Sequence, residues 1–255
     1  MLKKIIYKLL RKKIGFSKKF FKFDDALKVC DGYNDNNLID RIYKQSIKAI
    51  KNNKYEQDGI IYDNPIINEF IVDYLCNDYI INKKYSFKKK IKILDYGGSF
   101  GNLYYSLKNF IHMNFEWEVI EQKRKVTYAK KNSLFKEIRF SSQIDSKKKY
   151  DIIIFNTSFQ YLPNPIQIFK KLRNKSNIFI FTNLILNDDK YNYLKIENPD
   201  PKVYKFTYPC WFLSKFFLKE KEFNNLKVIK KKILNPPYAL SDNENYYNIL
   251  LERKN

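Results

Sequence analysis

The residues of this sequence best suited to bind a ligand lie where an apolar run ends in an acid and a glycine-rich turn. They are Asp95, Gly97, Gly98, Ser99 and Gly101, directly after the run IKIL. Glycine allows backbone angles and a close approach of ligand to backbone that a Cβ would block. A helix that begins after the turn offers free N–H groups. In an open α/β sheet such a turn lies in the ligand crevice, beyond the carboxyl end of a strand.

A second acid, Glu121, ends the next apolar run, about 26 residues after Asp95. An acid at this place is the usual partner of ribose hydroxyls. The turn has the order D-x-G-G-S-x-G and lacks the G-x-G-x-x-G of dinucleotide sites, so it predicts a nucleoside ligand without a pyrophosphate. The alternative is an α/β domain with tight turns and a solvated Glu121.

The elements that must position these residues are short apolar runs that alternate with helical segments. The runs span 91–95, 116–121, 138–141, 150–156 and 177–183, and the helical segments span 101–110, 123–131 and 165–174. This alternation predicts an α/β fold with a parallel sheet covered on both faces. Two further runs, 226–234 and 246–254, predict an antiparallel hairpin, and the aromatic stretch 205–223 predicts a helix.

The first part of the chain differs in composition from the rest. Residues 1–22 are basic, and Leu2, Ile5, Ile6, Leu9 and Leu10 follow the spacing of one helix face. A basic amphipathic helix suits an anionic membrane surface; the alternatives are a helix packed on its own domain or a frayed tail. Residues 23–85 are expected to be helical, with helices capped at Asp24 and Asn36 and a third opened by Asn64-Pro65.

Composition excludes several classes of protein. The chain has 255 residues, of which 44% are hydrophobic, so it can bury a core and is unlike a disordered protein. Its 49 Lys and Arg against 27 Asp and Glu give a net charge of +22, which suggests nucleic acid or a membrane. However, AT-rich codons encode Lys, Asn, Ile, Phe and Tyr, all abundant here, and this weakens that inference.

Cysteine and histidine usage argues against metal and disulfide sites. Cys30, Cys76 and Cys210 form no CxxC pair, so we expect no zinc, no disulfide framework and a reducing cytosol. The single histidine, His112, argues against a Ser-His-Asp triad. No apolar run approaches the about 18–20 residues of a membrane span.

The spacing of these motifs resembles that of class I S-adenosylmethionine-dependent methyltransferases. More closely, the chain is similar to a family of methyltransferases encoded among bacterial surface-polysaccharide (O-antigen or capsule) genes. The resemblance covers about residues 16–255. It rests on the blocks FDDALKVCDGY, YEQDGIIYDNP, ILDYGGSFG, VIEQ, SFQYLPNP and VYKFTYPCWF, in this order.

The resemblance implies a Rossmann-like, seven-stranded sheet with a final antiparallel hairpin strand. It implies that Asp95, Gly97, Gly98 and Gly101 line the methionine part of S-adenosylmethionine. Glu121 would hold the ribose, with Gln122 beside the adenine. Two departures stand out: Ser99 replaces the middle glycine of the general G-x-G-x-G turn, as in the polysaccharide-linked family, and the segment 182–185, TNLI, replaces that family's Asp-Arg-Thr-Pro.

Other strand ends predict the rest of the pocket. Asn156, Thr157, Ser158, Gln160 and Tyr161 follow the fourth strand, facing the sulfonium, while Ser142 and Asp145 follow the third, near the adenine. Methyl transfer needs alignment more than acid–base chemistry, but a sugar hydroxyl acceptor benefits from a general base. Tyr161, Tyr208 and Asp188 are the unranked candidates for this base. For the two tyrosines the alternative is packing.

Three other features are assigned structural roles. The NPPY at 235–238 matches a motif of adenine amino-methyltransferases, but it lies between the last two strands and not after the fourth, so we expect a hairpin loop. His112 precedes the second strand, away from the crevice. The aromatic stretch around Trp211 is expected to belong to the core, although a sugar-stacking surface stays open as an alternative.

These observations predict three parts: the basic segment 1–22, a helical cap 23–85 and a methyltransferase domain 86–255. The predicted protein is a cytoplasmic enzyme that uses S-adenosylmethionine, holds no metal and methylates a saccharide or a nucleotide- or lipid-linked sugar. Residues 1–20 would hold it on the anionic inner face of the membrane. The alternatives are a nucleic-acid methyltransferase or binder, which the charge alone favours, and a non-catalytic scaffold.

Overall fold

The computed structural model describes residues 14–32, 35–66, 68–79, 90–108, 111, 114–199, 206–235 and 240–254. The predicted basic helix at residues 2–10, His112 and most of the NPPY loop therefore lie outside the described residues. Among the helices that are described, none is both long and apolar enough to cross a membrane.

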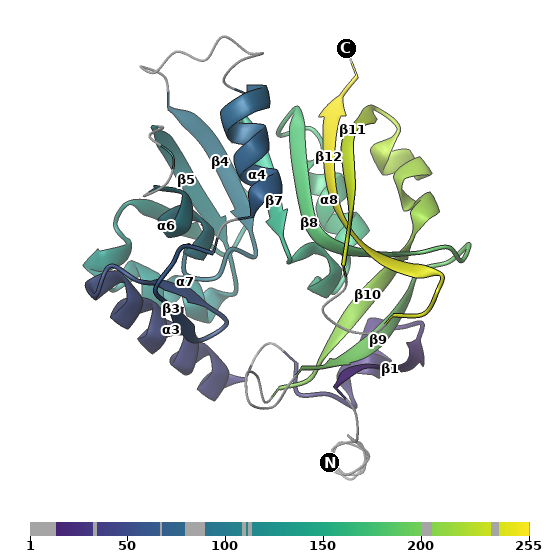
Figure 1. Ribbon diagram of the computed structural model, residues 1–255, viewed down its shortest axis with the longest axis horizontal. Coiled ribbons are helices and arrows are strands. Elements are labelled where there is room, and N and C mark those ends of the chain that lie inside the picture. Colours follow the sequence, from purple (N-terminus) through teal and green to yellow (C-terminus); the bar gives the residue numbers. More distant parts are fainter. Residues whose placement is uncertain are drawn as a thin grey trace.

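The central sheet of the molecule is the seven-stranded part of a ten-stranded sheet (Figure 1). Its order is β6-β5-β4-β7-β8-β12-β11. The first five strands in space are parallel, and β12 runs antiparallel to both of its neighbours. The strands are β4 (Ile91–Tyr96), β5 (Phe115–Ile120), β6 (Ile138–Ser141), β7 (Ile152–Asn156), β8 (Ile178–Asn187), β11 (Leu226–Leu234) and β12 (Glu244–Arg253). The α/β, Rossmann-like fold and the final antiparallel hairpin are thus confirmed.

Both faces of this sheet are covered, as the apolar strands require. Alternate residues point to opposite faces: Ile93 lies in one apolar cluster and its neighbour Leu94 in the other. The first cluster includes side chains of α6 (Asn102–Lys108) and α7 (Lys123–Lys130), and the second includes side chains of α8 (Pro165–Leu172). All three predicted helices are confirmed, and Pro165 stands in the first turn of α8 as expected.

The region 23–85 is not uniformly helical, so that prediction is wrong in part. A hairpin of β2 (Tyr55–Gln57) and β3 (Ile60–Tyr62) separates α3 (Asn36–Lys51) from α4 (Glu69–Asp73), which runs into a π-helix (Tyr74–Tyr79). The hairpin loop is Asp58-Gly59, and both residues have positive φ, +52° and +79°. This is the conformation of a type I′ turn, for which Asp-Gly is a preferred pair.

The predicted helix starts are displaced by a few residues. Asp35 caps α3 through bonds from the N–H groups of Asn37 and Leu38, whereas Asn36 lies inside the helix. Asn68 caps α4, so the helix does not start at Asn64-Pro65. The short α2 (Phe23–Leu27) has Asp24 in its first turn and no side-chain cap. For α3 and α4, the residue whose side chain reaches the free N–H groups decides the start.

A small antiparallel sheet joins the edge formed by the end of β8. It consists of β1 (Gly15–Phe20), β9 (Tyr193–Asn198) and β10 (Tyr208–Ser214), with β10 paired to β8. The helix predicted for 205–223 is therefore wrong: its first half is β10, and 3-10 helices η4 (Lys215–Lys219) and η5 (Lys221–Phe223) follow. Pro209 disfavours a helix here, and pairing with β9 supplies the backbone bonds instead.

The predicted boundary at residue 22 falls between two elements that share this small sheet. β1 is one of its strands, and α2 packs Ala26 against Leu194 and Ile196 of β9. In contrast, α3 packs on the α7 side of the central sheet. The N-terminal region is therefore divided: β1 and α2 pack with the small sheet, whereas α3 packs with α7 on the central sheet.

Candidate functional site

The turn from β4 to α6 has a backbone that few residues other than glycine adopt. The φ angles of Gly97, Ser99 and Gly101 are +78°, +52° and +86°. A Cβ built on Gly97 would lie 2.7 Å from the Cβ of Ser158, so the turn packs closely on the loop after β7. Ser99 holds a left-handed conformation that is uncommon outside glycine.

Asp95 lies buried beneath this turn. Its side chain is 0% exposed, and neither carboxylate oxygen has a hydrogen-bond partner among the described residues. A Cβ on Gly98 would lie 2.2 Å from the Asp95 Oδ2, so no residue with a side chain fits at position 98 without moving Asp95. Burial raises the pKa of Asp95 to about 7; the nearby Trp117 indole N–H opposes this rise, and the Glu121 charge adds to it. An unpartnered carboxyl of this kind suits a cationic or donating group of a ligand.

Glu121 follows β5 directly, beside the glycine turn. The parallel pairing of β4 with β5 places Tyr96 opposite Ile120, and the Gly97 N–H donates to the Ile120 carbonyl at 2.8 Å. The Glu121 carboxylate is not solvated. It accepts a bond from the Gln122 N–H at 2.6 Å and pairs with Lys125 Nζ at 2.7 Å, and both side chains of the pair are less than a tenth exposed.

The lysine at position 125 changes the charge of this region. It stands one turn after Glu121 on α7, and its charge also acts on Glu56 and Asp58 of the β2–β3 hairpin. A ribose bound by Glu121 would have to share the carboxylate with Lys125. Gln122 keeps a buried side-chain oxygen without a partner among the described residues, so a hydrogen-bond acceptor is present next to Glu121.

The predicted residues after β7 form one hydrogen-bond network with the end of β8. Asn156 accepts from the Thr182 hydroxyl at 2.7 Å, and the Thr157 hydroxyl accepts from Asn183 Nδ2 at 2.7 Å. Thr157 has a φ of +54°, which is strained for a β-branched residue. The fully buried Gln160 donates to the Asn183 carbonyl at 3.0 Å, and Ser158 donates to the Tyr96 carbonyl.

Ser142 and Asp145 lie in the loop after β6. Ser142 is exposed, and Asp145 accepts a bond from the Lys147 N–H at 2.9 Å. The preceding Ser141 carbonyl accepts from the Glu121 N–H at 3.0 Å, which places this loop beside the end of β5. The arrangement leaves Ser142 at the rim of the candidate site, with Asp145 turned to its own loop.

The three candidates for a general base are not together. Tyr161 and Tyr208 pack edge to face, with ring centroids 5.4 Å apart and an angle of 90° between the ring planes. Burial raises the pKa of Tyr161 well above its usual value, and the charge of Glu197 raises it further. Asp188 is 58% exposed and pairs with Lys215 at 3.3 Å on the surface. It therefore lies apart from the two tyrosines.

Glu197, which accepts a bond from the Tyr161 hydroxyl at 2.7 Å, is not among the residues predicted from the sequence. Glu56 and Asp58 are not among them either, although both fall in the block YEQDGIIYDNP. The Asp-Gly pair in that block is a signal that could have identified the hairpin. No local signal identifies Glu197, because its partner lies 36 residues away in the chain.

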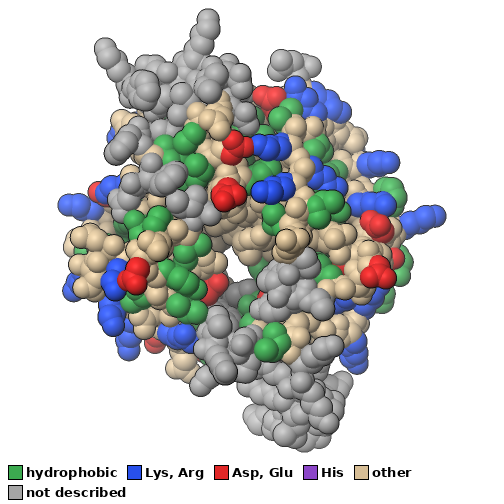
Figure 2. All heavy atoms as spheres, viewed as in Figure 1, with side chains coloured by type: hydrophobic (Ala, Val, Ile, Leu, Met, Phe, Trp, Pro, Cys, Tyr) green, Lys and Arg blue, Asp and Glu red, His purple; other side chains and the backbone are tan. Residues whose placement is uncertain are grey.

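Figure 2 shows a hollow in the face of the molecule, with acidic side chains at its rim. In Figure 1 this region lies beyond the carboxyl ends of β4 and β7, between α3 on one side and β9 and β10 on the other. Asp58 on the hairpin acts electrostatically on Glu197 of β9, so these two carboxyl groups approach each other from the two sides.

Comparison with known proteins shows the fold. No protein-family model and no curated protein sequence matches the chain. The N-terminal domain of EvdMO1, solved in the presence of SAH and D-fucose, has 14% identity and a TM-score of 0.50 over 87% of this chain and 100% of that one. An S-adenosylmethionine-dependent methyltransferase from Clostridium acetobutylicum has 16% identity and a TM-score of 0.42 over 74% of this chain and 100% of that one. The chain has the Rossmann-like fold of the class I methyltransferases.

Proposed function

We propose that this protein is an S-adenosylmethionine-dependent methyltransferase. The observation that carries the proposal is the glycine turn after β4 with Glu121 beside it, at the carboxyl ends of two adjacent parallel strands. The Gly97 N–H and the Ile120 carbonyl join the two strand ends directly. In an open α/β sheet this is the place where nucleoside ligands bind.

The residues present fit the cofactor at each end. The close packing at Gly97 and Gly98 leaves bare backbone for its methionine part, and the unpartnered Asp95 carboxyl suits its ammonium group. Glu121 offers carboxylate oxygens to the ribose, and the free Gln122 oxygen suits the adenine amine. When bound, the cofactor supplies an electrophilic methyl group on a sulfonium.

For the acceptor we propose a saccharide, or a nucleotide- or lipid-linked sugar. The EvdMO1 domain solved with SAH and D-fucose supports a sugar at a site of this fold. The neighbouring carboxyl groups of Asp58 and Glu197 argue against a nucleic-acid acceptor, because their charged forms repel phosphates. We place the reaction in the cytoplasm, with residues 1–20 as the contact to an anionic membrane surface.

The test has two steps, of which the first concerns the cofactor. Calorimetry should show binding of S-adenosylmethionine and SAH by the full chain, and no comparable binding of NAD. Absence of binding would overturn the proposal.

The second step measures transfer of a radiolabelled methyl group to a panel of monosaccharides, amino sugars and nucleotide sugars. Transfer to a member of this panel supports the enzyme. Binding without transfer to any member would instead support a non-catalytic scaffold. Retention on anionic vesicles, compared with a chain that lacks residues 1–13, tests the membrane contact.

A further inference from the structure

A buried glutamate, Glu197, lies within electrostatic reach of Asp58 on the β2–β3 hairpin. It belongs to β9 and is only 5% exposed. One carboxylate oxygen, Oε2, accepts the Tyr161 hydroxyl at 2.7 Å. The other oxygen, Oε1, accepts no hydrogen bond from any residue in the described part of the chain. No described lysine or arginine forms an ion pair with it.

A short connection joins Glu197 to the candidate cofactor turn. Tyr161 closes the 3-10 helix η3 (Phe159–Tyr161), and its N–H donates to the Ser158 carbonyl at 3.1 Å. Ser158 in turn contacts the glycine turn, since a Cβ on Gly97 would lie 2.7 Å from it. Glu197 is therefore linked through Tyr161 to the same loop that packs on the turn.

We propose that Glu197 is the general base of this site, and that Tyr161 is a positioning residue that holds its carboxylate. This inference rests on the proposed function. The acceptor's oxygen or nitrogen bonds to the donor methyl carbon while the carbon–sulfur electron pair stays on sulfur, and the acceptor's proton passes to Glu197 Oε1. The resulting carboxylic acid then loses that proton to solvent.

Glu197 suits this role better than the other candidates. Burial raises its pKa to about 7, and the Tyr161 hydrogen bond limits the rise, so it can both gain and lose a proton near neutral pH. Tyr161 is unsuited, because its pKa is raised well above the usual value for tyrosine. Asp188 is exposed and paired with Lys215.

The charged groups around Glu197 come from several elements. Asp58 acts on it from the hairpin and raises its pKa. On the neighbouring β10, Tyr208 stands opposite Glu197 in the strand pairing, and Cys210 is buried with its pKa raised well above the usual value, by burial and then by the Glu197 charge. Lys195 of the same strand is paired with Glu244, and Lys19 of β1 with Asp189, so neither lysine neutralises Glu197.

The first measurement follows the carboxyl group itself and requires no acceptor. Protein labelled with ¹³C at the glutamate carboxyl carbon is titrated by infrared spectroscopy in the SAH-bound state, and the Glu197→Gln spectrum is subtracted. We expect a difference band that titrates near pH 7, in line with the raised pKa of Glu197. A band that has already ionised below pH 5 would overturn the assignment.

The second measurement uses the acceptor identified in the radiolabel panel. Glu197→Gln should lower kcat by about 100-fold or more and abolish the rise of rate with pH, while SAH affinity stays within about threefold. Tyr161→Phe should shift that rise to higher pH, because the carboxylate loses a hydrogen bond that stabilises its charged form. Glu116→Gln, at an exposed position of β5, is the matched control and should leave kcat and the pH profile unchanged.

The outcomes separate this inference from the proposed function. A Glu197→Gln protein that still transfers methyl groups at the wild-type rate overturns the base assignment alone. A wild-type protein that transfers to no member of the panel overturns the base assignment together with the enzyme proposal. Circular dichroism shows whether each variant keeps its fold. If Glu197→Gln does not fold, the pH profile of Tyr161→Phe tests the base assignment instead, and an unshifted profile overturns it.

Discussion

Gly97 shows how one missing side chain shapes the candidate site. Its φ of +78° and its closeness to Ser158 leave no room for a Cβ. The same turn holds Ser99 at a positive φ, and Thr157 on the next loop is strained as well. Residues in such conformations cluster at ligand sites, where the surrounding structure keeps them in place.

We predict that Gly97→Ala abolishes measurable S-adenosylmethionine binding and lowers the free energy of unfolding by about 1–3 kcal/mol. The added Cβ would clash with Ser158 and push the turn away from the cofactor. Gly32→Ala is the control. Gly32 also has a positive φ, +75°, but its neighbour is Leu27 and it lies outside the candidate cofactor site. Chemical denaturation should show a lower free energy of unfolding for both variants. Calorimetry should show a loss of S-adenosylmethionine binding only for Gly97→Ala.

Glu121 offers a second test at the residue scale. Glu121→Gln removes the charge that pairs with Lys125 and would bind the ribose, so we expect weaker binding of S-adenosylmethionine by about 10- to 100-fold. Glu116→Gln on the same strand is exposed and should leave the affinity unchanged. Equal affinity for wild type and Glu121→Gln in calorimetry would show that Glu121 does not hold the cofactor.

At the scale of elements, the β2–β3 hairpin is attached to α3 by one buried acid. Glu56 accepts the Ser46 hydroxyl of α3 at 2.7 Å and the Gly59 N–H at 2.5 Å. The first bond ties the hairpin to the helix, and the second closes the hairpin loop. Together they set the position of the hairpin loop that carries Asp58.

The titration of Glu56 predicts how stability depends on pH. Burial raises its pKa from 4.5 to about 7, so its contribution is fully present below pH 4.5 and is lost as pH rises through about 7. At about 1.4 kcal/mol per pH unit this amounts to roughly 3 kcal/mol. Urea denaturation between pH 5 and 8 should therefore show a smaller decline for Glu56→Gln than for wild type.

The control for this experiment is Asp63→Asn, just after the same hairpin. Asp63 is exposed, and its bond to Lys54 lowers its pKa, so its contribution would be lost only at acidic pH. Between pH 5 and 8, the free energy of unfolding of Asp63→Asn should decline as that of the wild type does. A Glu56→Gln protein with the wild-type slope would contradict the assignment to Glu56.

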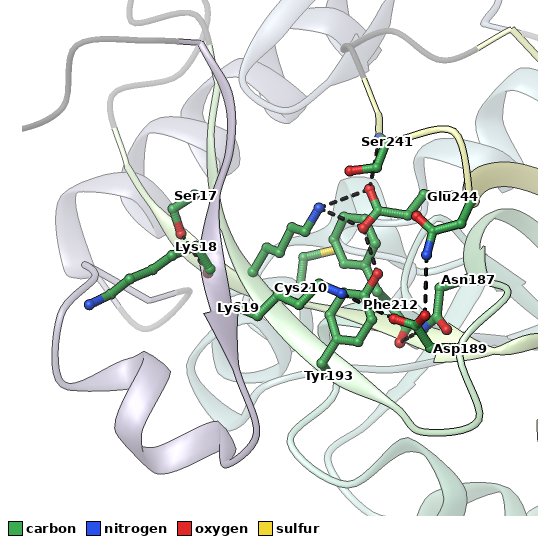
Figure 3. A network of polar contacts seen from close by, with 12 residues as sticks. Ser17, Lys18, Lys19, Asn187, Asp189, Tyr193, Cys210, Phe212, Ser241 and Glu244 are labelled. Atoms are coloured by element: carbon green, nitrogen blue, oxygen red, sulfur yellow. Dashed lines mark hydrogen bonds and ion pairs between the residues drawn. The ribbon is translucent and has the colours of Figure 1, made fainter.

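At the scale of the whole molecule, a buried ion pair joins the small sheet to the central sheet (Figure 3). Lys195 of β9 lies 2.6 Å from the Glu244 Oε1 at the start of β12, and the Tyr193 hydroxyl donates to the same carboxylate at 2.5 Å. The Glu244 side chain is 0% exposed. The ion pair and its tyrosine thus hold β9, and with it Glu197, against the rest of the fold.

We predict that Glu244→Ala lowers the free energy of unfolding by about 3–5 kcal/mol, because Lys195 is left buried without its partner. The double variant Lys195→Met with Glu244→Leu should recover much of this loss, since no buried charge remains unpaired. Lys227→Ala removes a partly exposed pair with Glu252 and should cost at most about 1 kcal/mol. Equal costs for Glu244→Ala and Lys227→Ala in urea denaturation would contradict this role of the pair.

The central sheet and its helices could be read from the sequence because their signals are local. The strand ends at Asp95 and Asn156, the turn at 97–101 and the helix at Pro165 each follow from residue types within a few positions. The hairpin at Asp58-Gly59 was equally local, but it was missed because the surrounding residues were interpreted as helix. The helix prediction for residues 205–223 was wrong for a different reason. The aromatic pattern of this segment suits a helix or a strand, and only pairing with β9 selects a strand for its first half.

Only the tertiary structure determined which partners the carboxyl groups of the candidate site have. The sequence determined that Glu121 stands where a strand ends, but not that Lys125 pairs with its carboxylate. It contains Glu197 and Tyr161, but their contact spans 36 positions and depends on β9 folding back beside η3. Backbone preference and apolar periodicity act over a few residues, whereas burial and charge pairing depend on which distant segments meet. This is why the fold could be predicted and the proposed base could not.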